Sequence, residues 1–214
     1  MTVKDIETPG SLWGTLGTRA RADSKESGVS VGELIQRFVF QRLLARVFQQ
    51  DGWLLKGGQA LLVRYPAAAR NSSDIDLLHS GRSDLEEAAQ ALEDAARLDL
   101  GDFFRFTPAG RTAHECGMEL RFTAGLVSST WLVKVDLVVR RTVTSVPVRR
   151  PLIPAVSLHW PADSWPDVML YPVADHVADK VCAIYELHGE RKRPSTRYRD
   201  LADLRSRKAR SPTT

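Results

Sequence analysis

Cysteine is scarce in this sequence. The two cysteines among its 214 residues, Cys116 and Cys182, lie far apart and lack the spacing of metal ligands. We expect them to be reduced residues of the protein core. The cysteine usage therefore indicates a cytoplasmic protein.

Long hydrophobic runs are absent as well. Residues 1–14 contain no apolar stretch of the kind that a signal peptide requires, and no run approaches the length of a membrane span. We expect a soluble protein with no membrane partner.

The composition suits one folded domain, or one domain with a helical appendage. A hydrophobic content of 43% is enough for a packed core, which argues against disorder. The net charge of +4 at pH 7 and the pI near 9.3 permit an anionic partner such as nucleic acid. This excess of positive charge is too small to establish one.

Two glycines lie at the start of the most informative stretch, residues 56–78. The apolar residues 53–55 predict a short strand that stops at Gly57-Gly58, with a helix-length segment after it. Residues without Cβ between a strand and a helix let backbone N–H groups approach a phosphate, and the helix dipole favours the anion. A plain turn is the simpler interpretation of two glycines taken alone.

Two acids lie at the other end of this stretch. In a strand, Asp74 and Asp76 would point to the same face while Ile75 packs into the opposite one. Paired carboxylates repel each other unless a cation lies between them, and oxygen ligands suit Mg²⁺. Two solvated acids at a strand end are the simpler alternative. Together with the glycines, the acids indicate a site for phosphate and metal.

A third acid interrupts an apolar strand further along the chain. Residues 131–139, WLVKVDLVV, predict a central strand in which an unpaired carboxylate of Asp136 would be costly. Either Asp136 lies at the strand end against Lys134 or Arg140, or it joins the earlier acid pair. In the second case it could share the metal or accept the proton of an attacking hydroxyl.

The remaining pattern predicts helices packed on a sheet. Two capping-box patterns predict helices over residues 30–50 and 83–97, and alternation of apolar and polar residues predicts strands at 103–107 and 118–123. Residues 1–29 are expected to form a short helix or arm.

Proline dominates the region that follows. Residues 143–172 contain six prolines and are expected to form an extended connection, too rich in proline for a helix or a central strand. Pro172 then opens a helix that carries Lys180 and ends at Gly189. A last helix is predicted over residues 197–208.

These residues resemble those of a known family. Gly57-Gly58 followed by Arg70-x-Ser72-x-Asp74-Ile75-Asp76 resembles the signature of the AbiEii/MenT-type nucleotidyltransferase-like toxins, within the polymerase-beta-like nucleotidyltransferase superfamily. Those proteins are the toxin halves of bacterial abortive-infection and toxin–antitoxin pairs. Residues 179–183 and the run Arg197-x-Arg199-Asp200-x-x-Asp203 are similar to the C-terminal motif of the family. The resemblance covers roughly residues 50–205, although the chain ends sooner after the last helix than in many members.

The resemblance implies an enzyme that transfers a nucleoside monophosphate from a nucleoside triphosphate to RNA, most specifically the 3′ end of tRNA, and so blocks translation. It also implies a cognate antitoxin protein as partner, and Mg²⁺ (or Mn²⁺) as the metal. The metal ligands would be Asp74, Asp76 and Asp136. The catalytic residues would be Asp74, Asp76, Asp136, Lys180 and Asp200. The nucleotide-binding residues would be Lys56, Gly57, Gly58, Arg70, Ser72 and Lys180.

The expected fold is α+β with α/β-like features, a nucleotidyltransferase palm in which helices flank a mixed β-sheet. We divide the chain into an N-terminal arm (1–29), a catalytic core (30–142), a proline-rich connection (143–172) and C-terminal helices that complete the active site (173–214).

Several alternatives remain open. Taken alone, Lys180 is a solvated helix lysine, and the basic residues between Arg191 and Arg210 form either a phosphate-binding surface or a solvated tail. An antibiotic-type nucleotidyltransferase with a small-molecule acceptor would need an acidic pocket, yet the acids outside the motifs do not cluster. A non-catalytic RNA- or partner-binding domain would be expected to lose one of the three carboxylates, and all three are present.

Overall fold

The computed structural model of the protein describes residues 6–66, 69, 71–158, 165–185, 187–188 and 193–194. Arg70 and Asp200, two of the predicted site residues, lie outside this part of the chain. The helix predicted over residues 197–208 and most of the basic C-terminal residues also lie outside it.

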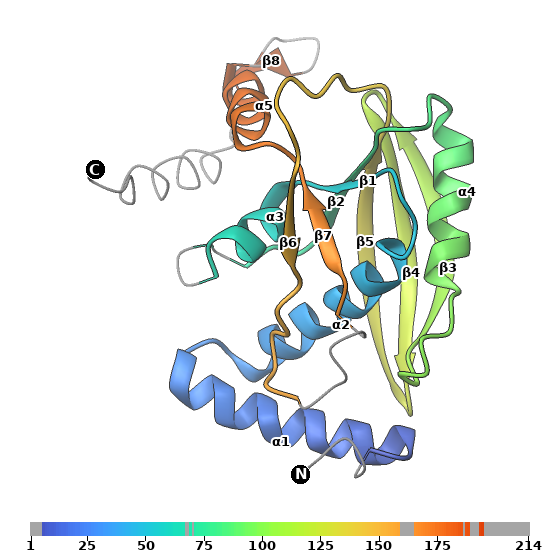
Figure 1. Cartoon of the computed structure of the whole chain (residues 1–214), viewed down its shortest axis with the longest axis vertical. Coiled ribbons are helices and arrows are strands. Elements are labelled where there is room, and N and C mark those ends of the chain that lie inside the picture. The colour runs from blue at the N-terminus through green and yellow to red at the C-terminus, as the bar shows by residue number, and fades with distance from the viewer. Residues whose placement is uncertain are drawn as a thin grey trace.

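A seven-stranded mixed β-sheet organises the molecule (Figure 1). Its order is β3-β4-β5-β2-β1-β7-β6, in which β2–β5 and β1–β7 pair in parallel and the other neighbours pair antiparallel. The strands are β1 (Trp53–Leu55), β2 (Ile75–His79), β3 (Arg105–His114), β4 (Gly117–Leu126), β5 (Ser129–Val138), β6 (Val148–Pro151) and β7 (Asp167–Leu170). The predicted α+β fold with a mixed sheet is confirmed.

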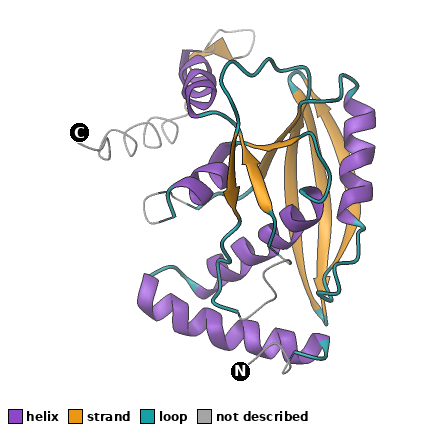
Figure 2. Cartoon of the chain, in the orientation of Figure 1, coloured by secondary structure: helices purple, strands orange, loops and turns teal. Residues whose placement is uncertain are grey.

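Helices cover the sheet on more than one side (Figure 2). In the described residues, α4 packs against β3, β4, β5 and α2, while α1 packs on α2 and α3 packs against β2. The helices are α1 (Pro9–Ser27), α2 (Val31–Val47), α3 (Gly57–Arg64), α4 (Leu85–Ala96) and α5 (Val173–Tyr185). Two short strands, β8 (Leu187–His188) and β9 (Arg193–Pro194), form a separate antiparallel pair.

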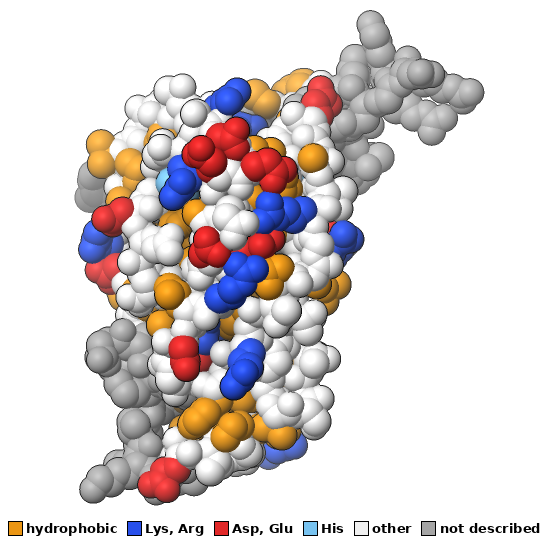
Figure 3. Space-filling model, turned by 90° about the vertical axis from the view of Figure 1, so that its right-hand side faces the viewer, with side chains coloured by type: hydrophobic (Ala, Val, Ile, Leu, Met, Phe, Trp, Pro, Cys, Tyr) orange, Lys and Arg blue, Asp and Glu red, His pale blue; other side chains and the backbone are white. Residues whose placement is uncertain are grey.

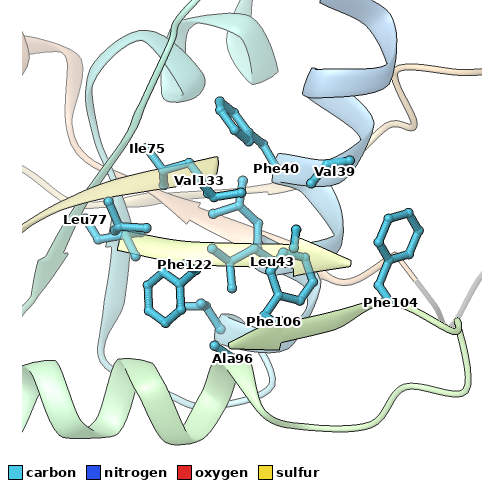
Figure 4. Close-up of a cluster of buried hydrophobic side chains, with 14 of the residues drawn as sticks. Val39, Phe40, Leu43, Ile75, Leu77, Ala96, Phe104, Phe106, Phe122 and Val133 are labelled. Carbon is cyan, nitrogen blue, oxygen red and sulfur yellow. The ribbon is translucent and has the colours of Figure 1, made fainter. Parts of the chain in front are cut away.

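The hydrophobic core lies between α2, α4 and the sheet (Figure 4). Phe40 and Leu43 from α2 meet Ile75 and Leu77 from β2, and these side chains are at most 1% exposed. The predicted alternation in β4 is confirmed, because Met118, Leu120 and Phe122 are buried while the residues between them are half-exposed. Burial of these aromatic and aliphatic side chains is the main force that holds the layers together.

An ion cluster lies inside this core. Arg42 and Arg46 of α2 are fully buried, and their guanidinium groups donate to the fully buried carboxylate of Asp102 at 2.7 and 2.5 Å. Burial alone would raise the pKa of Asp102, but the hydrogen bonds and charges of Arg46 and Arg42 outweigh it and hold the pKa below its ordinary value. The cluster ties α2 to the segment that leads into β3.

Several predictions about the elements are corrected. The N-terminal element is a 19-residue helix rather than a short one, capped by Thr8, and it buries one side chain per turn against the domain: Leu12, Leu16 and Ala20. Helix α5 ends at Tyr185, before the predicted Gly189. Asp84 rather than Ser83 caps α4. The two cysteines, Cys116 and Cys182, are exposed and not part of the core.

The proline-rich region also differs from its prediction. Residues 143–172 contribute two strands to the main sheet, and β7 lies between β1 and β6 instead of outside the sheet. Proline is compatible with this arrangement because Pro151 ends the edge strand β6 and Pro166 directly precedes β7, which itself contains none. The division of the chain into four parts stays a prediction.

The face that carries α4 is turned toward the viewer in Figure 3, where acidic and basic side chains are interleaved. Arg111 of β3 bridges Glu86 and Glu93 of α4 at 2.8 and 2.7 Å, and Arg97 pairs with Asp94 at 2.8 Å. The basic groups on this face are therefore largely neutralised by neighbouring acids. None of the described helices is both long and apolar enough to cross a lipid bilayer.

Candidate active site

The glycine pair lies where β1 passes into α3. Lys56 is the N-cap of α3, and its backbone N–H donates to the backbone oxygen of Asp76 at 2.8 Å. Gly57 has φ +57°, and a Cβ on it would lie 1.6 Å from Oδ2 of Asp76. A Cβ on Gly58 would lie 2.6 Å from Oγ of Ser72. Only residues without a side chain allow the start of α3 to approach β2 this closely.

The sheet register brings two of the predicted acids together. Asp76 of β2 and Asp136 of β5 are direct partners in the parallel ladder. Partners on neighbouring strands point to the same face, so both carboxylates leave the sheet on the same side. Ile75 and Leu77, which flank Asp76, are fully buried on the opposite side, as the alternation predicted.

Several charged groups surround Asp76 and change its pKa. Burial is the largest cause that raises the pKa of Asp76 to about 7, followed by the negative charges of Asp74 and Asp136. The positive charges of Lys56 and Lys180 act in the opposite direction. The two other acids and the two lysines therefore lie within electrostatic reach of Asp76.

The donor chemistry of this cluster fits a hard divalent cation. Carboxylate oxygens are the ligands that Mg²⁺ and Mn²⁺ prefer, and a cation would relieve the repulsion that raises the pKa of Asp76. Among the described residues, however, no group of three or more acidic, histidine or cysteine side chains is already arranged to hold a metal ion. The acids could hold a metal only after their side chains adjust.

Ser72 orients Asp74 in this structure. Ser72 is 5% exposed, and its Oγ donates to Oδ1 of Asp74 at 2.8 Å. A hydroxyl has a single proton to donate, so this hydroxyl is not directed at a phosphate site here. Ser72 was predicted to bind phosphate, and in this structure its hydroxyl contacts the neighbouring acid.

Asp136 contacts a histidine that the sequence pattern did not single out. Nε2 of His114, at the end of β3, lies 2.8 Å from Oδ1 of Asp136. The expected alternative partners bind elsewhere in the described structure, because Lys134 lies 4.0 Å from Glu119 and Arg140 donates to the backbone oxygen of Ser83. His114 at the end of β3 therefore contacts Asp136 of β5 across the intervening strand β4.

Helix α5 brings the C-terminal part of the chain to the site. Lys180 is 9% exposed, so the interpretation as a solvated helix lysine is wrong. One residue earlier, Asp179 accepts from Nζ of Lys56 at 3.0 Å and from Nη1 of Arg141 at 2.5 Å. Nζ of Lys56 also lies over the ring of Tyr171, 4.5 Å from its centroid.

A second acid of α5 fixes the helix to the loop between β5 and β6. The carboxylate of Asp175 accepts hydrogen bonds from the hydroxyl and the backbone N–H of Thr144 and from the N–H of Ser145, and these bonds lower its pKa. The sequence gives no indication that Asp175 and Arg141 have these contacts. Asp175 is only an acid in the first turn of a helix, and Arg141 is only a basic residue after a strand. Their partners lie thirty or more residues away along the chain.

Comparison with solved structures supports the fold. MenT4, a nucleotidyltransferase toxin from Mycobacterium tuberculosis, is 17% identical, with a TM-score of 0.63 over 92% of this chain and 64% of its own. JHP933 from Helicobacter pylori is 14% identical, with a TM-score of 0.53 over 82% of this chain and 66% of its own. This chain thus spans about two thirds of the length of these proteins.

No curated protein matches the chain. A sequence profile does match it over residues 38–206, which include the glycine pair, the three acids and all of α5, and that profile describes the nucleotidyl transferase AbiEii toxin of type IV toxin–antitoxin systems. The chain therefore belongs to the AbiEii family of nucleotidyltransferase toxins.

Proposed function

We propose that this protein is a magnesium-dependent nucleotidyltransferase toxin that adds a nucleoside monophosphate from a nucleoside triphosphate to RNA. The observation that carries the proposal is the close approach of Gly57 to Asp76, with Asp136 in register beside it. This arrangement combines a phosphate-binding turn with paired carboxylates, and a nucleotide and its metal need both.

The three acids would share one metal site in the proposed reaction. Asp74, Asp76 and Asp136 would hold Mg²⁺ or Mn²⁺, and Ser72 keeps Asp74 in place through its hydroxyl. When bound, such an ion polarises the α-phosphorus and neutralises the leaving pyrophosphate. His114 plays the corresponding orienting role for Asp136, through the contact at 2.8 Å.

The start of α3 would bind the phosphates. The first N–H groups of a helix have no partner within the helix, and here they belong to a turn in which Gly57 lies against Asp76 and Gly58 against Ser72. Lys56 and Lys180 add positive charge within reach of Asp76. Arg70 and Asp200 remain predicted members of the site from the family motifs, for nucleotide binding and catalysis respectively.

The transfer itself is an in-line displacement. The oxygen of the acceptor hydroxyl forms a bond to the α-phosphorus while the bond from that phosphorus to the oxygen bridging to the β-phosphate breaks. Pyrophosphate leaves with the electron pair of the broken bond. We assign the hydroxyl proton to the carboxylate of Asp136, whose side chain is 44% exposed and so open to an acceptor.

The acceptor that we propose is the 3′ end of tRNA, and the consequence is blocked translation. The family and the name of MenT4 as a nucleotidyltransferase toxin support a nucleotidyl transfer that harms the cell. The type IV toxin–antitoxin assignment of the family supports a cognate antitoxin protein as partner.

The test is incubation of the protein with total RNA, Mg²⁺ and each α-labelled nucleoside triphosphate in turn. We expect label to enter tRNA with the wild type and not with Asp76→Ala, because the acid nearest the glycine turn is lost. Asp51→Ala removes an exposed acid in the turn before β1 and is the matched control, which should retain full activity.

Two outcomes would contradict the proposal. Label that appears on a small molecule, but on no RNA, would identify an antibiotic-type enzyme. Binding of RNA without incorporation from any triphosphate, in Mg²⁺ or in Mn²⁺, would identify a non-catalytic binding domain.

A further inference from the structure

One carboxylate on α5 joins two cations that come from different parts of the sheet. Asp179 accepts from Nζ of Lys56 at 3.0 Å and from Nη1 of Arg141 at 2.5 Å, through different oxygens. Lys56 follows β1 and Arg141 follows β5, so these two residues are 85 positions apart in the sequence. Without Asp179, two like charges from separate strands would repel each other at this point.

Tyr171 completes the arrangement. Its hydroxyl forms a hydrogen bond with Asp179, and burial together with the charges of Asp179 and Asp175 raises the pKa of Tyr171 to about 12. The phenol therefore stays protonated at neutral pH and acts as a donor to the carboxylate. The face of the same ring lies under Nζ of Lys56. Asp179 thus contacts two cations and lies beside the phenol of Tyr171.

Lys56 connects the contacts of Asp179 to the candidate active site. Lys56 directly precedes Gly57, and its N–H binds the backbone oxygen of Asp76. Its positive charge lowers the pKa of Asp76, so the ammonium group lies within electrostatic reach of the acids. Arg141, which Asp179 links to Lys56, therefore adds a second positive group on the side of the site where the glycine turn begins.

Both cations keep donors for an anion. An ammonium group has three N–H donors and a guanidinium group has five, whereas Asp179 accepts one contact from each in the distances given above. The side chain of Arg141 is 43% exposed, so it is open to a ligand from solution. Arginine binds phosphate oxygens in a bidentate way and lysine binds them as a point charge.

We propose that Lys56 and Arg141 form a binding pair for the terminal phosphates of the nucleoside triphosphate, and that Asp179 is the positioning residue that holds the pair together. The inference rests on the proposed function and deepens it. Arg141 becomes a nucleotide-binding residue, and α5 contributes to substrate binding through Asp179 as well as through Lys180.

Replacement of Asp179 tests whether this residue positions the two cations or only adds a negative charge near the phosphates. If Asp179 only added negative charge near the phosphates, Asp179→Asn would strengthen triphosphate binding, because a repulsive charge would be gone. If Asp179 positions the two cations, the same variant weakens binding, because an amide cannot hold both of them. The two explanations predict changes of opposite sign.

The experiment is a calorimetric titration of the full chain with each of the four ribonucleoside triphosphates and the matching monophosphates, in Mg²⁺. For Arg141→Gln and Asp179→Asn we expect triphosphate affinity to fall about ten- to a hundredfold, as for loss of a charge-assisted contact. Monophosphate affinity should stay within about twofold. Arg141→Lys should recover part of the loss. Arg105→Gln removes the same charge at the exposed start of β3 and should change neither affinity.

The outcomes distinguish this inference from the proposed function. A wild-type protein that binds no triphosphate would overturn both. A wild type that binds a triphosphate, with Arg141→Gln unchanged or Asp179→Asn tighter, would overturn only the phosphate pair and leave the enzyme proposal intact. Equal losses for triphosphate and monophosphate would show that the residues support the fold of the site instead, which also overturns the inference. Thermal melting of each variant confirms that the chain is folded.

Discussion

Gly57 and Asp76 occupy adjoining space that leaves no room for a Cβ, since a Cβ on Gly57 would lie 1.6 Å from Oδ2 of Asp76. The two residues come from different elements, the first turn of α3 and the middle of β2. The glycine lets the N-terminus of a helix and a partly ionised carboxylate occupy neighbouring positions. The proposed site therefore depends on a missing side chain as much as on the acids.

Gly57→Ala should abolish nucleotidyl transfer while the chain still folds. The new Cβ displaces the carboxylate of Asp76, and φ +57° costs roughly 1–2 kcal/mol for a residue with a side chain. We expect activity to fall at least about a hundredfold, as for misplacement of a catalytic group by an ångström. The measurement is the RNA-labelling assay together with the free energy of unfolding in urea.

Gly14→Ala is the control for this substitution. Gly14 lies on the exposed side of α1, where a Cβ would meet nothing within 4 Å. Alanine there should stabilise the helix by about 0.5–1 kcal/mol and leave activity unchanged. Full activity in Gly57→Ala would show that the contact between Gly57 and Asp76 has no part in the reaction.

Asp76→Asn should stabilise the metal-free protein at neutral pH. The pKa of Asp76 rises from 3.8 to about 7 on folding, so between these values the unfolded chain has released a proton that the folded chain keeps. The stability of the wild type therefore falls as the pH rises through this window. Because asparagine lacks the charge, we expect the variant to gain on the order of 4 kcal/mol at pH 8 and to lose this advantage near pH 4.

Urea unfolding in EDTA at pH 4.5, 6 and 8 measures this difference. Asp51→Asn, in the exposed turn before β1, should give no pH-dependent difference from the wild type. Addition of Mn²⁺ should stabilise the wild type and not Asp76→Asn, since a cation would relieve the repulsion among the acids. A variant that is less stable than the wild type at pH 8 in EDTA would contradict the described cluster.

Asp102→Asn should strongly destabilise the protein. The carboxylate is fully buried and binds both Arg42 and Arg46, so the variant removes the negative charge that these two buried guanidinium groups share. Loss of one partner of a buried ion pair typically costs about 3–5 kcal/mol. Calorimetry of the variant should show a much lower melting temperature. Asp99→Asn in the same loop, where the side chain is exposed, should cost less than about 1 kcal/mol.

Both cysteines should react with a thiol reagent in the native state. Cys116 lies in the β3–β4 turn and Cys182 on α5, and both are exposed. We expect two reactive thiols per chain without denaturant, and one in each of the variants Cys116→Ser and Cys182→Ser. Thiols that react only in denaturant would show that the cysteines are buried in the core, as the sequence analysis predicted.

Local patterns predicted the parts of the site that lie close together along the chain. The apolar residues of β1, the glycine pair and the alternation around Ile75 each follow from the geometry of one element. The helix that carries Lys180 was predicted in the same way, from its proline start and its apolar stripe. Such features depend on neighbours within a few residues, so the sequence alone can indicate them.

The tertiary structure alone decided how distant residues meet. The register of β2 against β5 places Asp136 beside Asp76, and the packing of α5 on the sheet brings Asp179 to Lys56 and Arg141. The burial of Arg42 and Arg46 could not be predicted from the helix pattern, because arginine is ordinarily a surface residue and its opposing charge here, Asp102, lies 56 residues or more away along the chain. Periodicity determines which face of an element is buried, but the order and register of the strands determine which faces come together.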